Sequence, residues 1–156
     1  MFNQAVPAPV AQTIDSTIAE HESMSRGLTN VIWHSYSTGA WNHIDTETVR
    51  SYKLNGLVQL QQGPEKAYLE GDAAVSMLAQ MHDRFVNAAA DAIHLARADK
   101  IEEAYKILSC QYARASRQVL WLLQNLKQRI NPQSQSGGGI PSLASMSARS
   151  LPAFPA

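Results

Sequence analysis

The stretch IEEAYKILSCQYARASRQVLWLLQNL, residues 101–126, decides the fold class. An average spacing of 3.5 residues between apolar side chains marks a long helix that packs on its neighbours at a shallow angle. This stretch keeps that spacing for nearly four heptads, and therefore predicts a long helix inside a helical bundle. The positions in the seam are Ile101, Tyr105, Leu108, Tyr112, Ala115, Val119, Leu122 and Leu126.

Residues just outside this stretch predict where its helix begins and ends. Residues 99–102 (DKIE) have the arrangement of a capping box, in which a side chain at each end satisfies a free backbone N–H. Pro132 cannot continue a helix, so the helix should end at Asn131. We expect one continuous helix between these signals.

Two earlier stretches show the same helical period. The first runs from Ile14 to Ile32, with Asp15 or Ser16 as a possible cap and Gly39 as its predicted end. The other runs from residue 75 to residue 96 and follows Gly71-Asp72, a break and an N-cap. Both stretches predict long helices.

The segment between them, residues 42–70, is less regular. Residues 45–48 (DTET) look like a helix start, Gly56 and Gly63-Pro64 interrupt the pattern, and a further helical turn is expected around residues 65–69. The chain has no useful alternating strand pattern. The sequence therefore predicts an all-α four-helix bundle with a short, irregular second helix.

Composition divides the chain into three zones. We expect a flexible segment at residues 1–12, the bundle at residues 13–131, and a disordered tail rich in Pro, Gly and Ser at residues 132–156. The tail contains two small apolar clusters, at residues 140–143 and 151–154, which could serve as a docking peptide. Plain disorder is the alternative.

Charge and cysteine content limit the classes of function. Thirteen Lys and Arg residues balance thirteen Asp and Glu residues, so we expect neither nucleic acid nor an anionic membrane as a partner. No run of eighteen apolar residues predicts a membrane span, and residues 1–7 do not resemble a signal peptide. With the single cysteine Cys110, these features predict a cytoplasmic protein.

Two histidines lie in the apolar seams of separate helices. His21 lies in the seam of the first helix and His82 in the seam of the third. A lone histidine on such a face is more often a hydrogen-bonded core residue than a ligand. Two that face one bundle interior raise the prospect of a metal site, because bundles build such sites from facing helices.

The segments around these histidines resemble the chemoreceptor zinc-binding domain family of bacterial signalling proteins. In that family a histidine on the first helix, a C-x-x-G motif on a short helix and an HxxxH pair on the third helix hold the zinc. The resemblance covers roughly residues 14–130, and its order and spacing match the family. It rests on residues 19–21 (AEH), 53–56 (KLNG), 81–89 (MHDRFVNAA), Ala104, 115–116 (AS) and 122–123 (LL).

The resemblance departs from the family at two of the four metal ligands. His21 and His82 match family histidines, whereas Lys53 stands at the cysteine position and Val86 at the second histidine of HxxxH. Two imidazoles do not complete a tetrahedral zinc site. We therefore expect no cofactor, with zinc as the only metal that the resemblance leaves open.

The resemblance implies a role in bacterial signalling. The first expectation is a non-catalytic adaptor that forms a homodimer and binds a chemoreceptor or a diguanylate cyclase. Trp121, beside Leu120 and Leu123, is a candidate for the dimer seam, with core packing as the alternative. Two other functions stay open: a metal or small-ligand sensor at His21 and His82, and a secretion or flagellar export chaperone.

Overall fold

The computed structural model describes residues 8–63, 66–69 and 71–130, and these residues form helices and turns without a strand. The prediction of an all-α fold is confirmed. The elements in chain order are α1 (Ala8–Thr38), the 3-10 turn η1 (Trp41–His43), α2 (Thr46–Arg50), α3 (Asn55–Gln62), α4 (Lys66–Leu69), α5 (Ala73–Arg97), α6 (Ile101–Ile107), the π-helical turn η2 (Leu108–Tyr112) and α7 (Ala113–Ile130).

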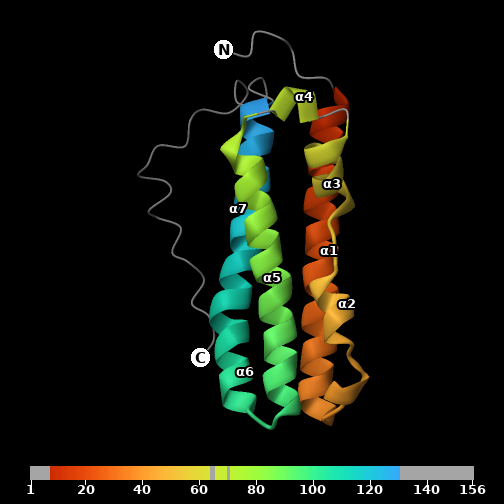
Figure 1. The fold of residues 1–156 in the computed structure, drawn as a ribbon, viewed down its shortest axis with the longest axis vertical. Helices are drawn as coiled ribbons and strands as arrows, with labels where there is room; N and C mark the ends of the chain where they lie inside the picture. Colours follow the sequence, from red (N-terminus) through yellow and green to blue (C-terminus); the bar gives the residue numbers. More distant parts are fainter. Residues whose placement is uncertain (1–7, 64–65, 70, 131–156) are drawn as a thin grey trace, which may run out of the picture.

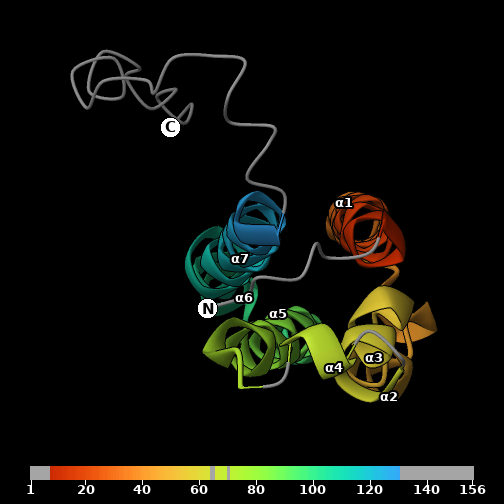
Figure 2. The same ribbon diagram turned by 90° about the horizontal axis from the view of Figure 1, so that it is seen from above.

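The long helices lie side by side along one axis (Figure 1). The helix α5 packs on both α6 and α7, and α1 packs on α7. The short helices complete the arrangement, since α2 contacts α5 and α3 contacts α1. Seen from above, α2 and α3 form a column beside α1 and α5, and α4 crosses towards α5 (Figure 2). The central helix α5 thus contacts most of the other elements.

The core consists of two clusters along the bundle. One cluster lies towards the end where α5 turns into α6, and it includes Ile32, Phe85 and Ile93. The second lies towards the end of α7 and includes Ile14 and Leu123. All five side chains have no more than 2% of their surface exposed. The heptad seams of the long helices supply these residues.

Three predicted helix ends are confirmed. Asp45 caps α2 by accepting a hydrogen bond from the Glu47 backbone N–H, and Asp72 caps α5 in the same way through Ala74. Gly39 follows α1 with a φ of 71°, which glycine adopts without steric cost.

The predicted starts of the first and last helices are wrong. The helix α1 begins at Ala8, inside the segment up to residue 12 for which flexibility was expected, and Val10 is buried in the core. The capping box at residues 99–102 is not formed. Asp99 instead has a φ of 62°, and the Lys100 N–H donates to the Leu95 carbonyl, which is the closing turn of α5. Lys100 precedes α6 without a capping side chain.

The last helix is also not a continuous α-helix. Between α6 and α7 the turn Leu108–Tyr112 is π-helical, so it holds more than 3.6 residues. This turn interrupts the heptad register, so the residues before it and after it do not share one face. Tyr105, which the heptad pattern placed in the core, is 51% exposed, whereas Tyr112 is buried.

A close contact fixes α3 on α1. The backbone of Gly56 approaches Thr17 so closely that a Cβ atom on Gly56 would overlap the Thr17 hydroxyl. On the same side, the Glu20 carboxylate accepts hydrogen bonds from the backbone N–H groups of Asn55 and Gly56, at 3.0 and 3.4 Å. A side chain of α1 therefore caps the start of α3, next to His21.

No helix among the described residues is both long enough and apolar enough to cross a membrane. The segment for which a disordered tail was predicted, residues 132–156, lies outside the described residues.

Candidate functional site

His21 lies at the centre of the bundle. Its side chain has no exposed surface, and its ring lies 4.9 Å from that of Phe85. The Nε2 atom of His21 is 2.9 Å from the Ser116 hydroxyl on α7, and Nδ1 has no hydrogen-bond partner among the described residues. Burial, together with the nearby His82, lowers the pKa of His21 from 6.5 to about 4. His21 is therefore neutral at pH 7.

His82 lies near the same phenylalanine. It is 2% exposed, and its ring centroid is 6.4 Å from that of Phe85. Nε2 of His82 donates a hydrogen bond to the Tyr52 carbonyl at 2.8 Å, which ties the segment before α3 to α5. Its Nδ1 atom, like that of His21, is buried and has no hydrogen-bond partner within the described part of the chain. The predicted burial of both histidines is confirmed.

The other two residues of the expected site provide no ligand. The Lys53 side chain is exposed, although it borders the same small depression as His82. Val86 is 1% exposed and packs in the core, as an apolar residue should. Glu22 and Asp83, which directly follow the two histidines in the sequence, are exposed. Within residues 8–63, 66–69 and 71–130, no three His, Cys, Asp or Glu side chains are close enough to hold a metal ion.

These residues do not fit a tetrahedral zinc ion. Zinc takes about four ligands, of which the protein supplies at least three in an open site. The buried Nδ1 atoms of His21 and His82 are two possible donors, and neither Lys53 nor Val86 adds a third.

The contact between His21 and Ser116 has the length of a base–nucleophile pair but lacks its other requirements. A base with a pKa of about 4 accepts a proton poorly at neutral pH. Catalytic pairs also use a third group to orient the base, and Nδ1 of His21 has no such partner in the structure that is described. The arrangement favours a structural hydrogen bond. That the protein is not an enzyme stays a prediction.

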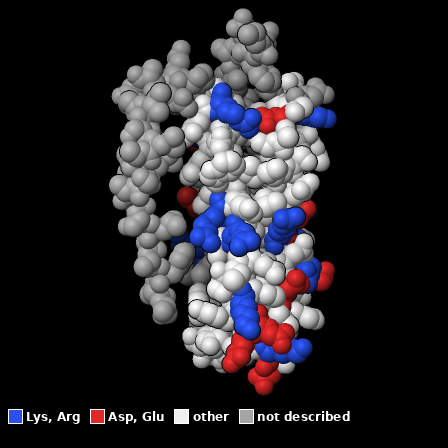
Figure 3. All heavy atoms as spheres, turned by 90° about the vertical axis from the view of Figure 1, so that its left-hand side faces the viewer, with Lys and Arg blue, Asp and Glu red and all other residues white. Residues whose placement is uncertain are grey.

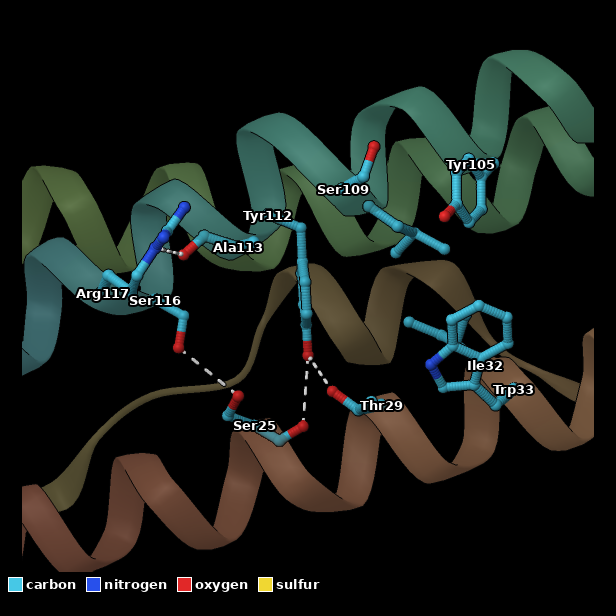
Figure 4. Close-up of a pocket in the computed structure, with 11 residues that line it drawn as sticks. Ser25, Thr29, Ile32, Trp33, Tyr105, Ser109, Tyr112, Ala113, Ser116 and Arg117 are labelled. Carbon is cyan, nitrogen blue, oxygen red and sulfur yellow. Dashed lines mark hydrogen bonds between the residues drawn. The ribbon is translucent and has the colours of Figure 1, made fainter. Parts of the chain in front are cut away.

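A groove opens between α1 and the rod formed by α6, η2 and α7, with a volume of about 440 Å³ (Figure 4). We call it the aromatic groove. Trp33 and Tyr105 lie at one end, and Ser116 and Arg117 lie at the other. The residues that line it are Ser25, Thr29, Ile32, Trp33, Tyr105, Leu108, Ser109, Tyr112, Ala113, Ser116 and Arg117.

Three aromatic side chains at the end of this groove are exposed. Trp33, Tyr36 and Tyr105 have 47%, 48% and 51% of their surface accessible. The ring of Trp33 meets Tyr36 edge to face at 5.7 Å and Tyr105 at 6.4 Å. The three rings therefore form one exposed cluster that joins α1 to α6, and we call it the aromatic wall.

Hydrogen bonds between α1 and the opposite rod form the floor of the groove. The Tyr112 hydroxyl donates to the Ser25 carbonyl at 3.2 Å and lies 3.0 Å from the Thr29 hydroxyl. Ser116 lies between the Ser25 hydroxyl, at 3.4 Å, and His21. Through Ser116 the floor of the groove is thus connected to the buried His21. The burial of the Tyr112 hydroxyl raises the pKa of Tyr112.

Sequence reasoning missed the aromatic groove, although signals for it were present. Ser25 lies four residues after His21, on the same face of the predicted helix, and Thr29 follows it one turn later, so two polar groups point towards a neighbouring helix. Ser116 stood out only through the family resemblance. No pattern indicated that Trp33 and Tyr105 would lie together.

The predicted partner surface on α7 is only partly available. Trp121 is 61% exposed and Leu120 is partly exposed, so both could contact another chain. Leu123 has no exposed surface because it belongs to the core stripe that faces α5 and α1. Its assignment to a dimer seam is therefore wrong.

Charged residues gather on a different face from the groove. Figure 3 shows Lys and Arg side chains at mid-height on the side of α5 and α7. Arg84 and Arg114 border a depression between α5 and the rod of η2 and α7, together with Asp91 and Cys110. The aromatic groove, between α1 and α7, opens on a neighbouring side.

Comparisons with protein-family models, with curated proteins and with solved structures find no match to this chain.

Proposed function

We propose that the chain is a non-catalytic signalling adaptor that binds a partner protein through the aromatic groove. The observation that carries this proposal is the aromatic wall, since Trp33, Tyr36 and Tyr105 each leave about half of their surface open beside a groove of about 440 Å³. Tryptophan, tyrosine and arginine dominate the binding energy of protein interfaces. A groove lined by the first two, with Arg117 at its far end, has that composition.

The scaffold is proposed to be a four-helix bundle of the chemoreceptor zinc-binding type that has kept the helices and lost the metal. The column of α2 and α3 takes the place of the short helix that carries the C-x-x-G motif in that family. Support comes from His21 and His82, which are buried beside one phenylalanine, and from Gly56, which the contact with Thr17 requires. The Ser116 hydroxyl is the hydrogen-bond partner of Nε2 of His21, and the Tyr52 carbonyl is the partner of Nε2 of His82.

The proposed partner is a bacterial chemoreceptor or diguanylate cyclase in the cytoplasm. A helix of such a protein could lie in the aromatic groove, in the way that amphipathic helices occupy apolar grooves. We also propose that the chain dimerises through the outer face of α7, where Trp121 and the partly exposed Leu120 lie.

Photo-crosslinking tests the adaptor proposal. A photoreactive phenylalanine analogue replaces Tyr105 in the native host, and a matched chain carries it in place of Trp121. We expect the first chain to capture a chemoreceptor or a diguanylate cyclase, which then binds the purified protein, and the second to capture another copy of the chain. Capture of an export substrate by the first chain would favour the chaperone alternative, and no capture would contradict the proposal.

A second candidate function is a sensor of a metal or a small ligand at the two histidines. The observation that favours it is the pair of buried Nδ1 atoms without a hydrogen-bond partner among the described residues, because buried polar atoms are rarely left unpaired. Elemental analysis of untagged protein, with His82→Ala as the control, tests it. About one metal per wild-type chain, lost in the variant, would support the sensor. Metal-free protein whose stability is unaffected by chelator would exclude its metal version.

A further inference from the structure

We propose that residues 151–155 of this chain (LPAFP) bind the aromatic groove of the same molecule and compete with the partner. The segment follows α7 in the sequence and lies outside the residues that the structure describes. This inference rests on the proposed function only in treating the aromatic groove as a surface that binds protein chains.

The groove has the features that an extended, proline-containing segment requires. Segments with a P-x-x-P pattern bind between aromatic side chains that lie on a surface. The aromatic wall supplies such side chains, because Trp33 meets both Tyr36 and Tyr105 edge to face and all three are about half exposed. Polyproline II segments make no internal hydrogen bonds and keep their backbone solvated, which a groove that is open at the surface allows.

The segment matches this surface in chemistry. Residues 152–155 read P-A-F-P, and three residues per turn of polyproline II place Pro152 and Pro155 on one edge. Leu151 and Phe154 are also three apart and share the adjacent edge. The segment contains no charged residue, and Arg117 is the only charged residue among those that line the groove. Apolar contacts therefore dominate, and salt should change the binding little.

The connecting chain has a suitable length. From the end of α7 at Ile130, the groove extends between Arg117 and Tyr105, which is about 20 to 38 Å along the helix axis at about 1.5 Å per residue. Residues 131–150 include three consecutive glycines and several serines, and a flexible linker of that length and composition has a root-mean-square span of about 25 Å. A linker whose span matches the distance gives an effective concentration of the order of 1 mM.

The effective concentration sets the fraction of molecules in which the segment occupies the groove. At about 1 mM, a segment with a dissociation constant of about 0.1 mM would fill the groove in about ten molecules for each molecule whose groove is empty. The partner would then bind about tenfold more weakly to the full chain than to a chain whose segment cannot dock. The other apolar cluster, residues 140–143, has one proline, and a flexible linker as short as residues 131–139 has a root-mean-square span of about 16 Å, which falls short of the near end of the groove.

Fluorine NMR of the full chain labelled with 5-fluorotryptophan tests the proposal. The chain contains three tryptophans, and Trp33→Phe identifies the signal from the groove. We expect the Trp33 signal to shift in the variant F154A/P155A and to stay unchanged in the control I140A. The signals of Trp41, which is buried, and Trp121, on another face, should not move, which shows that the bundle is intact.

A peptide added in trans distinguishes docking within one molecule from docking between molecules. A synthetic peptide of residues 149–156 should return the Trp33 signal of the variant to its wild-type position, with half-saturation at or below about 1 mM. An unchanged Trp33 signal in F154A/P155A, or no effect of several millimolar peptide, would overturn the proposal. Recovery of the signal on mixing with micromolar unlabelled wild-type chain would also overturn it, because the segment would then dock between molecules.

The two proposals fail in different ways. If a partner is captured at the groove but the Trp33 signal is the same in F154A/P155A as in wild type, only the docking of residues 151–155 is overturned. A Trp33 signal that responds to the variant, in a chain whose groove captures no partner, would overturn only the adaptor function.

Discussion

Replacing Gly56 with alanine should destabilise the fold, because the new methyl group has no space. It would overlap the Thr17 hydroxyl and lie 2.9 Å from Thr17 Cβ and 3.2 Å from the Thr13 carbonyl. Thr17 cannot easily move, since it is fully buried and its hydroxyl donates to that carbonyl at 2.6 Å. The alternative is that α3 shifts away from α1 and weakens the two hydrogen bonds from Glu20.

The magnitude follows from two opposing effects. Overpacking of this kind costs about 3 kcal/mol, at the upper end of its usual range, because both neighbours are rigid. Alanine in a helix regains about 0.5–1 kcal/mol relative to glycine. We therefore expect Gly56→Ala to lower the free energy of unfolding by about 2–2.5 kcal/mol. Gly27→Ala is the matched control, because a Cβ atom there meets nothing within 4 Å, and it should raise stability by up to about 1 kcal/mol.

Urea unfolding followed by circular dichroism measures both changes by linear extrapolation. The double variant T17A/G56A adds a test of mechanism, since removing the Thr17 hydroxyl relieves the worst overlap. It should be about 1 kcal/mol more stable than the sum of the single changes predicts. Equal effects of Gly56→Ala and Gly27→Ala would show that a methyl group at residue 56 does not overlap Thr17. Strict additivity in the double variant would show the same.

Three other predictions concern the buried histidines. Because burial lowers the pKa of His21 to about 4, the unfolded chain binds a proton more readily than the folded chain between pH 6.5 and 4. Urea unfolding across this range should show a loss of about 3 kcal/mol as the pH falls, and His21→Gln should remove most of that dependence. Ser116→Ala leaves Nε2 of His21 without its partner and should cost about 1–3 kcal/mol in the same assay, whereas the exposed Ser109→Ala should cost less than about 0.5 kcal/mol. The double variant K53C/V86H should bind zinc and gain thermal stability from it, unlike wild type, and failure to bind would contradict the proposed correspondence with the zinc-binding family.

Helix ends that depend on one side chain could be predicted from the sequence. Asp45, Asp72 and Gly39 act within their own turns, so a local pattern identifies them. Asp99 shows the limit of such reasoning. Its position in the sequence allows Asp99 either to cap the start of α6 or to close the end of α5. The hydrogen bond from the Lys100 N–H to the Leu95 carbonyl shows that Asp99 belongs to the turn that closes α5.

Features that depend on contacts between helices could not be predicted. The π-helical turn at residues 108–112 contains only residues that an α-helix also accepts, so its sequence carries no signal. Tyr105, in the helix before that turn, is exposed and meets Trp33. The burial of His21 and His82 followed from the heptad seams, but the partners Ser116 and Tyr52 come from distant segments.

If the partner binds in the aromatic groove, its affinity should differ between two tryptophan variants of the chain. Trp33 and Trp121 are both exposed, at 47% and 61%, but only Trp33 lines the groove. We predict that Trp33→Ala weakens binding of the partner by about 2 kcal/mol or more, which is about 30-fold, while Trp121→Ala changes it less than about twofold. Equal losses in the two variants, or a loss confined to Trp121→Ala, would contradict the account.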